Sequence, residues 1–285
     1  MVSPRQIASI ILVIHFTLSA CTVDEPTEIV DDFRTINIAD SLGLNSGDAK
    51  IFLLPAPLQI VSALHIQSIP YQPELIRNVP KDLTGNKEYR IALNLGINTI
   101  DLGYSTVYGD YQMAINYATN VKELMEILGI RSALKSPLIK RFEENASNVD
   151  SLSSIILEAY SASHEYFQLN EREGVGLLIL TGCFIEGLYL ATGVNQAVEN
   201  RQVHGLIALH KEYSANILLL LSFYRNNADV ANLLDKLEAL VIELEDINYD
   251  YNSSSGKAVL DKPISTGRLL KIKATILDIR RSVRI

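Results

Sequence analysis

Apolar residues recur every three or four positions through most of the chain beyond residue 86, which is the spacing of amphipathic helices. Proline, glycine and capping residues divide this pattern into segments. The segments predict helices over 57–68, 89–108, 110–128, 137–145, 150–167, 171–192, 196–224, 229–247 and 269–283. No run alternates convincingly as a strand, and residues 248–262 are expected to form a loop. The predicted fold is therefore all-α, a bundle or stack of antiparallel helical hairpins.

The segment 171–192 is apolar on every side, which is typical of a central buried helix or of a membrane span. Four glycines and the carboxylate of Glu186 interrupt it and disfavour the span. The glycines are Gly174, Gly176, Gly182 and Gly187. We expect this segment to be the buried middle helix of the bundle, with glycines that let neighbouring helices approach closely.

Two predicted helices have well-defined buried faces. The face of the helix over 110–128 comprises Ile115, Ala118, Val121, Leu124, Met125 and Leu128. The face of the last helix comprises Leu269, Ile272, Ile276, Ile279 and Val283. The outer face of the last helix is basic, with Arg268, Lys271, Lys273, Arg280, Arg281 and Arg284. We interpret this outer face as solvated, and docking to an acidic partner is the alternative.

The first 21 residues carry the features of an export signal that ends in a lipidation site. Arg5 is followed by an apolar run over 7–18, and Leu18-Ser19-Ala20-Cys21 resembles the lipobox of bacterial lipoproteins. The apolar run is shorter than the roughly 20 residues that a transmembrane helix needs. The resemblance implies cleavage before Cys21 and acylation of its thiol. Several acyl chains on one residue would attach the protein stably to a membrane.

The sequence predicts three regions: a signal peptide over 1–20, a lipidated cysteine with a flexible, disordered tether over 21–50, and a helical domain over 51–285. The tether is rich in acidic residues, glycine and serine. Its Asp24-Glu25 pair weakly resembles export tags of surface lipoproteins in Bacteroidetes, although a solvated linker is the simpler interpretation. Within the domain, His65 is expected to be a core histidine.

Composition narrows the possible partners. The net charge is -8, so nucleic acid is an unsuitable partner. The chain has two cysteines, and lipidation of Cys21 leaves Cys183 without a disulfide partner. The apolar neighbours of Cys183 indicate a small buried hydrophobic residue and not a nucleophile.

Known cofactor and metal motifs are missing from the sequence. The histidines beyond residue 21 are His65, His164, His204 and His210, and none has the spacing of a zinc-binding helix. Gly174-Val-Gly176 lacks the third glycine of a dinucleotide loop, and no Gly-x-Ser-x-Gly occurs. We therefore expect no metal and no cofactor.

Glu186 is the strongest candidate for a functional residue. A carboxylate in an apolar helix must be paired, hydrogen-bonded or protonated, and it can mark a ligand pocket. The proposed pocket includes Tyr104 and Tyr108. The simpler alternative is a structural hydrogen bond from Glu186 to a buried tyrosine such as Tyr104, Tyr108 or Tyr160, with the tyrosines serving mainly in packing.

Two stretches resemble the uncharacterised α-helical lipoproteins of Bacteroidetes. The first covers residues 95–130 and includes Leu-Gly-Ile-Asn-Thr-Ile-Asp-Leu-Gly-Tyr-Ser-Thr-Val-Tyr. The second covers residues 179–192 and includes Phe-Ile-Glu-Gly-Leu-Tyr. The resemblance implies an envelope lipoprotein and brings no catalytic residues with it.

Two functions follow as hypotheses. The first is a lipid-anchored cell-envelope protein, at the periplasmic face of the outer membrane or at the cell surface, that binds or scaffolds a protein or small ligand. In this case the partners are the membrane, through Cys21, and an unknown envelope protein or small ligand. The second is an envelope hydrolase with a site around a buried carboxylate.

Overall fold

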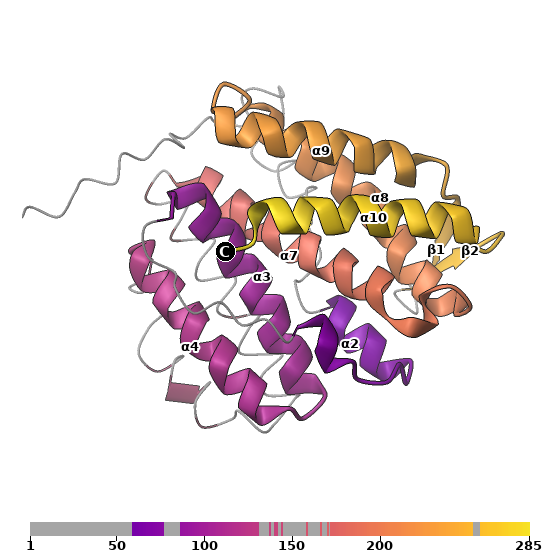
Figure 1. The fold of residues 1–285 in the computed structure, drawn as a ribbon, viewed down its shortest axis with the longest axis horizontal. Coiled ribbons are helices and arrows are strands. Elements are labelled where there is room, and N and C mark those ends of the chain that lie inside the picture. Colours follow the sequence, from indigo (N-terminus) through magenta and orange to yellow (C-terminus); the bar gives the residue numbers. More distant parts are fainter. Residues whose placement is uncertain are drawn as a thin grey trace, which may run out of the picture. The chain divides into compact units, whose positions relative to one another are not determined.

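The computed structural model describes residues 59–76, 86–130, 172–252 and 257–285, together with residues 137, 140, 141, 144, 158, 166 and 170. All belong to one structural unit within residues 31–285. The described helices are α2 (Gln59–Ile66), α3 (Glu88–Val107), α4 (Tyr111–Ile127), α7 (Glu173–Gly193), α8 (Arg201–Ser222), α9 (Ala228–Glu245) and α10 (Thr266–Val283), shown in Figure 1. Two 3-10 turns lie at Pro73–Leu75 and Asn195–Ala197. The prediction of an all-α bundle is confirmed.

The α3–α4 hairpin forms as its sequence predicts. A tight turn with Gly109 at φ 76° joins the two helices, and Asp110 caps α4 because its carboxylate accepts a hydrogen bond from the backbone N–H of Met113. Gly129, at φ 67°, follows the end of α4. The short connection leaves the two helices packed against each other.

The buried face of α4 agrees with the predicted one only in its second half. Leu124, Met125 and Leu128 are buried as predicted, whereas Ile115 is 58% exposed and Ala114, Tyr117 and Asn120 are buried in the first half. Asn120 donates to Asn98 of α3 at 3.4 Å, whereas Tyr117 donates to the carbonyl of Ile76 and accepts from Arg284, so both inward polar groups have partners. A pattern of apolar residues alone could not identify the first half of this face.

The central position of α7 is confirmed. Among the described residues it is the one helix long and apolar enough to cross a membrane, and 78% of its most apolar window is buried within the protein. It packs against α3, α8 and α10. Such burial is the arrangement expected of a core helix in a bundle.

A pair of glycines allows α3 and α7 to touch backbone to backbone. A Cβ atom added to Gly96 would lie 2.0 Å from the carbonyl oxygen of Ile179, and one added to Gly182 would lie 2.0 Å from the carbonyl oxygen of Leu93. Both distances are far shorter than any van der Waals contact. We refer to this close approach, centred on Gly96 and Gly182, as the glycine crossing.

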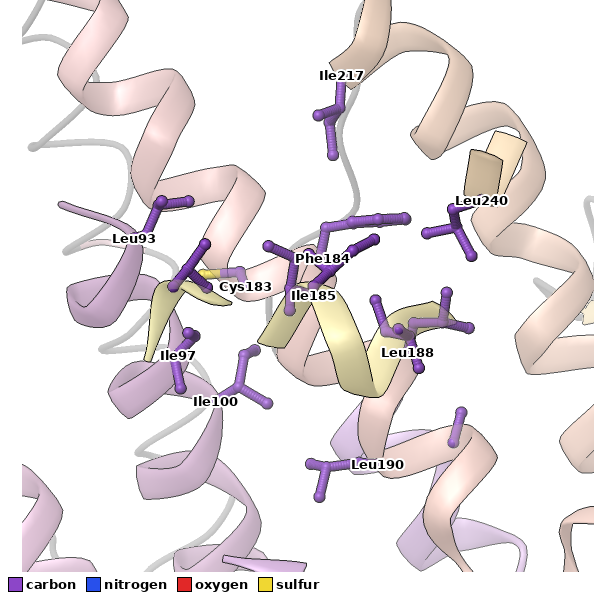
Figure 2. Packing of buried hydrophobic residues seen from close by; sticks show 14 of the residues in the cluster. Leu93, Ile97, Ile100, Cys183, Phe184, Ile185, Leu188, Leu190, Ile217 and Leu240 are labelled. Carbon is purple, nitrogen blue, oxygen red and sulfur yellow. The ribbon is translucent and has the colours of Figure 1, made fainter. Parts of the chain in front are cut away.

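Apolar side chains fill the space around the glycine crossing. Figure 2 shows side chains of α3 facing those of α7, with residues from α8 and α9 on the other side of α7. They include Leu93, Ile97 and Ile100 of α3, Cys183, Ile185 and Leu188 of α7, Ile217 of α8 and Leu240 of α9. The five predicted core residues of the last helix are also buried, which confirms the face assigned to α10.

Two helix starts differ from the predicted ones. The residues after α7 form a 3-10 turn, and α8 begins only at Arg201 instead of residue 196, capped by the side chain of Asn200. Likewise Asn227 caps α9, and Asp229 lies within its first turn. Each helix start has several asparagines or aspartates nearby that could act as the N-cap, and tertiary contacts determine which of them does.

The predicted loop over 248–262 contains a β-hairpin instead. Strands β1 (Tyr249–Asn252) and β2 (Lys257–Leu260) pair antiparallel. β2 packs against α8, where a Cβ on Gly205 would lie 2.7 Å from the carbonyl oxygen of Ala258. The prediction missed the hairpin because a two-stranded sheet is stable only when it packs on another element.

Several predictions lie outside the described residues. They are the signal peptide, the lipidated Cys21, the tether over 22–50, and most of the helices predicted over 137–145 and 150–167, including Tyr160 and His164.

Candidate functional site

Five polar side chains from four helices meet around Glu186 in the interior of the bundle. They are Asp101 of α3, Tyr117 of α4, Glu186 of α7, Arg280 of α10 and Arg284 just beyond the end of α10. Asp101, Tyr117 and Glu186 are fully buried, and the side chains of both arginines are 11% exposed. We call these five residues the buried charge cluster.

Arg280 and Glu186 form a two-point ion pair. Nε and one terminal nitrogen of Arg280 donate to the two carboxylate oxygens at 2.6 and 2.8 Å. The guanidinium carbon also lies 3.9 Å from the ring centre of Tyr189, one turn further along α7. This geometry orients the planar guanidinium and favours the ionised form of Glu186 against the effect of burial.

Arg284 links the second carboxyl group to the first. Its guanidinium donates to Asp101 Oδ2 at 3.2 Å and to the hydroxyl of Tyr117 at 3.2 Å, and it lies 3.5 Å from Glu186 Oε1. Tyr117 in turn donates to the backbone carbonyl of Ile76. The arginines come from positions four residues apart, which places both on one side of the helix.

Burial shifts the protonation of both acids. It raises the pKa of Glu186 to about 7, against the opposing charge of Arg284. It also holds the pKa of Asp101 well above its usual range, and the neighbouring Glu186 adds to the rise. Burial alone would lower the pKa of Arg284, but the charges of Asp101 and Glu186 raise it overall. Because Glu186 has the two-point pair with Arg280, we assign it the negative charge and Asp101 the more strongly held proton.

Backbone hydrogen bonds extend this network to the last residues of the chain. Asn94 of α3 donates to the carbonyl of Val283 at 2.8 Å and accepts from the N–H of Ile285 at 3.0 Å. Arg90 donates to the carbonyl of Ser282 at 3.1 Å. The end of α10 is thus fixed to α3 and α7 by polar contacts, in addition to its apolar face.

In the described structure, the carboxyl groups of the buried charge cluster are not accessible to a substrate. A catalytic acid or base must reach a substrate, whereas Glu186 and Asp101 have no exposed surface. Both oxygens of Glu186 already accept from arginine. A buried ion pair of this kind fixes the relative position of helices and adds little net stability, because desolvation offsets the attraction.

Tyr104 and Tyr108 lie in a separate group of rings. Tyr71 stacks on Tyr108 with ring centres 5.2 Å apart, and Tyr104 and His65 meet Tyr108 edge-on at 4.9 and 5.2 Å. Tyr104 accepts from the N–H of Gln72, and Tyr108 donates to the carbonyl of Ile69. Neither hydroxyl bonds to Glu186 in the described structure, so the structure does not unite the three residues of the predicted pocket in one network.

The histidines are structural where the structure describes them. His65 is exposed and not in the core as predicted. His204 bonds to the carbonyl of Ala197 and accepts from the N–H of Ile264, whereas His210 donates to the carbonyl of Leu206 and burial lowers its pKa to about 4. Within the described ranges no group of histidine, cysteine and acidic residues could hold a metal ion.

Cys183 is buried beside the glycine crossing. Its thiol lies 3.5 Å from the carbonyl oxygen of Gly96, and burial raises its pKa to about 12. The prediction of an unreactive core cysteine agrees with this environment.

The sequence marks Glu186 as a candidate but does not mark its partners. Arg280 and Arg284 were assigned to a solvated outer face, which is wrong because both belong to the buried charge cluster. One signal was present: Arg280 and Arg284 directly follow the core residues Ile279 and Val283 in the helical register. Asp101 gave a weaker signal, since it is an acid flanked by Ile100 and Leu102 in α3.

The comparisons with known proteins found no similarity: no family model, no curated protein and no solved structure matches this chain.

Proposed function

We propose that this chain is a lipid-anchored protein of the bacterial cell envelope whose helical domain acts as a binding or scaffold module. Support for the anchor comes from the order of features in the first 21 residues: a basic residue, an apolar run and the Leu-Ser-Ala-Cys sequence ending at Cys21. The proposed location is the outer membrane, at its periplasmic face or at the cell surface. The proposed relatives are the helical lipoproteins of Bacteroidetes.

One observation favours a scaffold over an enzyme. The carboxyl groups of Asp101 and Glu186 are enclosed and engaged by two arginines, and neither has exposed surface. A scaffold requires rigid helices that keep their positions when a partner binds. The buried charge cluster supplies such rigidity because it connects four helices through oriented polar contacts.

The alternative is an envelope hydrolase, and one observation favours it. Two neighbouring carboxyl groups with raised pKa values, Asp101 and Glu186, have the chemistry of an acid–base pair. This function requires an opening that exposes both groups to a substrate. Slow deuterium exchange at the amides around Glu186 would count against such an opening.

Lipidation is tested by labelling cells with radioactive palmitate and separating their membranes. We expect the label on the wild-type chain and on Cys183→Ser, and none on Cys21→Ser, which should leave the membrane fraction. The two cysteines make matched variants, because the chain has no others. Equal labelling of the wild type and Cys21→Ser would contradict the proposed anchor.

Binding is tested by chemical crosslinking in intact cells followed by mass spectrometry of the tagged protein. A scaffold predicts one envelope partner at constant stoichiometry, crosslinked through one face of the helical domain. Recovery of no partner, under conditions that capture other envelope complexes, would contradict the scaffold and favour the hydrolase.

A further inference from the structure

α10 differs in charge from the rest of the chain. Five of its 18 residues are basic and one, Asp278, is acidic, whereas the whole chain has a net charge of -8. The structure separates these basic residues into two kinds, those that have an acidic partner and those that do not.

Two of the five cations have acidic partners. Arg280 pairs with Glu186 in the buried charge cluster, and Arg268 pairs at the surface with Asp246, just beyond the end of α9, at 2.6 Å. The single acid of the helix, Asp278, pairs with Lys236 of α9 at 2.5 Å. It therefore does not compensate the remaining cations.

The other three cations are exposed. Lys271, Lys273 and Arg281 have no acidic partner in the described part of the chain. Arg281 lies close enough to Tyr189 to influence its pKa, which places it beside the end of the helix that the buried charge cluster holds. Three unpaired positive charges thus project from one element of an acidic protein.

These cations flank apolar residues on the outer face of the helix. At roughly 100° per residue, Leu270, Lys273, Leu277 and Arg281 lie within an arc of about 80°, away from the buried row, with Lys271 at the edge of the exposed face. Leu270 is 57% exposed. We call Leu270, Lys271, Lys273, Leu277 and Arg281 the α10 stripe.

We propose that the α10 stripe docks the helical domain on an anionic phospholipid surface. This inference rests on the proposed lipid anchor, which would keep the domain near a membrane. Basic residues beside exposed apolar ones are the pattern of helices that lie at membrane interfaces. Each lysine or arginine near an anionic surface strengthens binding by about five-fold.

Charge complementarity fixes which face turns to the membrane. The rest of the chain carries the excess of acidic residues, which anionic lipid repels, whereas the α10 stripe is attracted. The attraction of three cations is weak for a free protein. An anchored protein binds the same surface at a high effective concentration, so weak docking suffices to orient it.

The buried charge cluster would make this docking orient the whole bundle. α10 is fixed to α7 and α3 through Arg280 and Arg284, and Figure 1 shows α10 lying across α7 and beside α9. Because the helix cannot turn about its axis without breaking these pairs, the α10 stripe keeps a constant direction relative to the bundle.

The test uses the full protein, purified from membranes and reconstituted into vesicles of phosphatidylcholine alone or of equal phosphatidylcholine and phosphatidylglycerol. An environment-sensitive fluorophore is attached at Leu270→Cys, with Ile242→Cys of α9 as the control position because Ile242 is 67% exposed. Burial protects Cys183 from labelling. We expect a blue shift at position 270 with phosphatidylglycerol, reversed by high salt, and no shift at position 242.

Matched charge variants separate position from net charge. The stripe variant carries Lys271→Gln, Lys273→Gln and Arg281→Gln, and the control variant carries Lys87→Gln, Lys122→Gln and Lys140→Gln. Both lower the net charge by three. We expect the stripe variant to lose docking by about five-fold for each cation removed, and the control variant to retain it.

Two results would overturn the proposal. The first is equal emission at position 270 in both kinds of vesicle. The same result is expected if the α10 stripe binds an acidic protein and not anionic lipid. The second is an equal loss in both triple variants. Failure of the proposed lipid anchor gives a different result, because the protein would then float with neither kind of vesicle. The proposed docking, which depends on the anchor, would then be rejected together with it.

Discussion

The two halves of α7 are held by opposite kinds of contact. Its first half touches α3 at the glycine crossing, where backbone meets backbone and no side chain separates the helices. Its second half places Glu186 among Arg280, Arg284 and Asp101, where charged groups fill the space between helices. Both sites are buried. The glycine crossing has no room for a larger side chain, whereas the buried charge cluster has no tolerance for a charge without a partner.

This difference predicts different tolerances. At the glycine crossing any added atom must displace a backbone carbonyl, so size decides stability and polarity matters little. In the buried charge cluster a side chain of similar volume fits, but removal of one charge leaves its partner buried without compensation. The following predictions test this contrast, beginning with the largest expected effect.

Gly182→Leu should be the most damaging substitution. Even its Cβ would lie 2.0 Å from the carbonyl oxygen of Leu93, so α3 and α7 would have to separate along the crossing. We expect a loss of more than about 4 kcal/mol in the free energy of unfolding, measured by urea denaturation. Gly267→Leu is the control, since nothing lies within 4 Å of an added Cβ there, and comparable losses in both variants would contradict the contrast.

Glu186→Gln should be nearly as damaging although it changes the volume little. It leaves the guanidinium group of Arg280 buried without its carboxylate partner, whereas Arg284 keeps Asp101, at a cost of about 3–5 kcal/mol. Glu238→Gln removes an exposed partner of Arg225 and should cost less than about 1 kcal/mol. Adding Arg280→Met to Glu186→Gln should restore part of the loss. A double variant less stable than Glu186→Gln would show that charge balance is not the dominant factor.

Asp101→Asn should change how stability depends on pH. The pKa of Asp101 is raised by burial and by Glu186, and other groups facing it are Tyr117, Tyr189 and Arg284. An acid with a raised pKa stabilises the fold below its unfolded pKa, and this contribution is lost as pH rises through the folded value. Burial also raises the pKa of Glu186 from 4.5 to about 7. The free energy of unfolding therefore falls between these two pH values because of Glu186 as well.

Removal of the Asp101 carboxyl should therefore reduce the loss of folding stability that occurs as the pH rises. We expect the melting temperature of Asp101→Asn, relative to the wild type, to rise as the pH increases from below the unfolded pKa of this acid to neutral pH. Asp235→Asn, at an exposed pair with Arg225, is the control. A constant difference across this range would contradict the assignment of a retained proton to Asp101.

The smallest effect concerns Cys183, at the glycine crossing. Burial raises the pKa of its thiol to about 12, so little thiolate forms near neutral pH. We expect no alkylation at position 183 when the folded protein is treated with iodoacetamide, and alkylation at that position after denaturation, each read by peptide mass spectrometry. Alkylation of the folded protein at a comparable rate would show that the two helices separate readily at the crossing.

Most of the helical fold was predictable because burial in a bundle leaves a periodic pattern. The core residues of α10, the cap at Asp110 and the central α7 all follow from local spacing. The first half of the α4 face and the hairpin over 249–260 were not predictable in this way. The first depends on polar partners supplied by another helix, and the second on packing against α8.

The candidate site divides in the same manner. The sequence by itself marked Glu186 as a carboxylate that needed a partner, because an apolar helix cannot leave it unpaired. It also determined the helical class and the character of α7. Only the tertiary structure decided that Arg280, Arg284 and Asp101 are the partners and that Tyr104 and Tyr108 belong elsewhere. The physical reason is that residues 101, 186 and 280 are separated by whole helices, and no local periodicity records which of them meet.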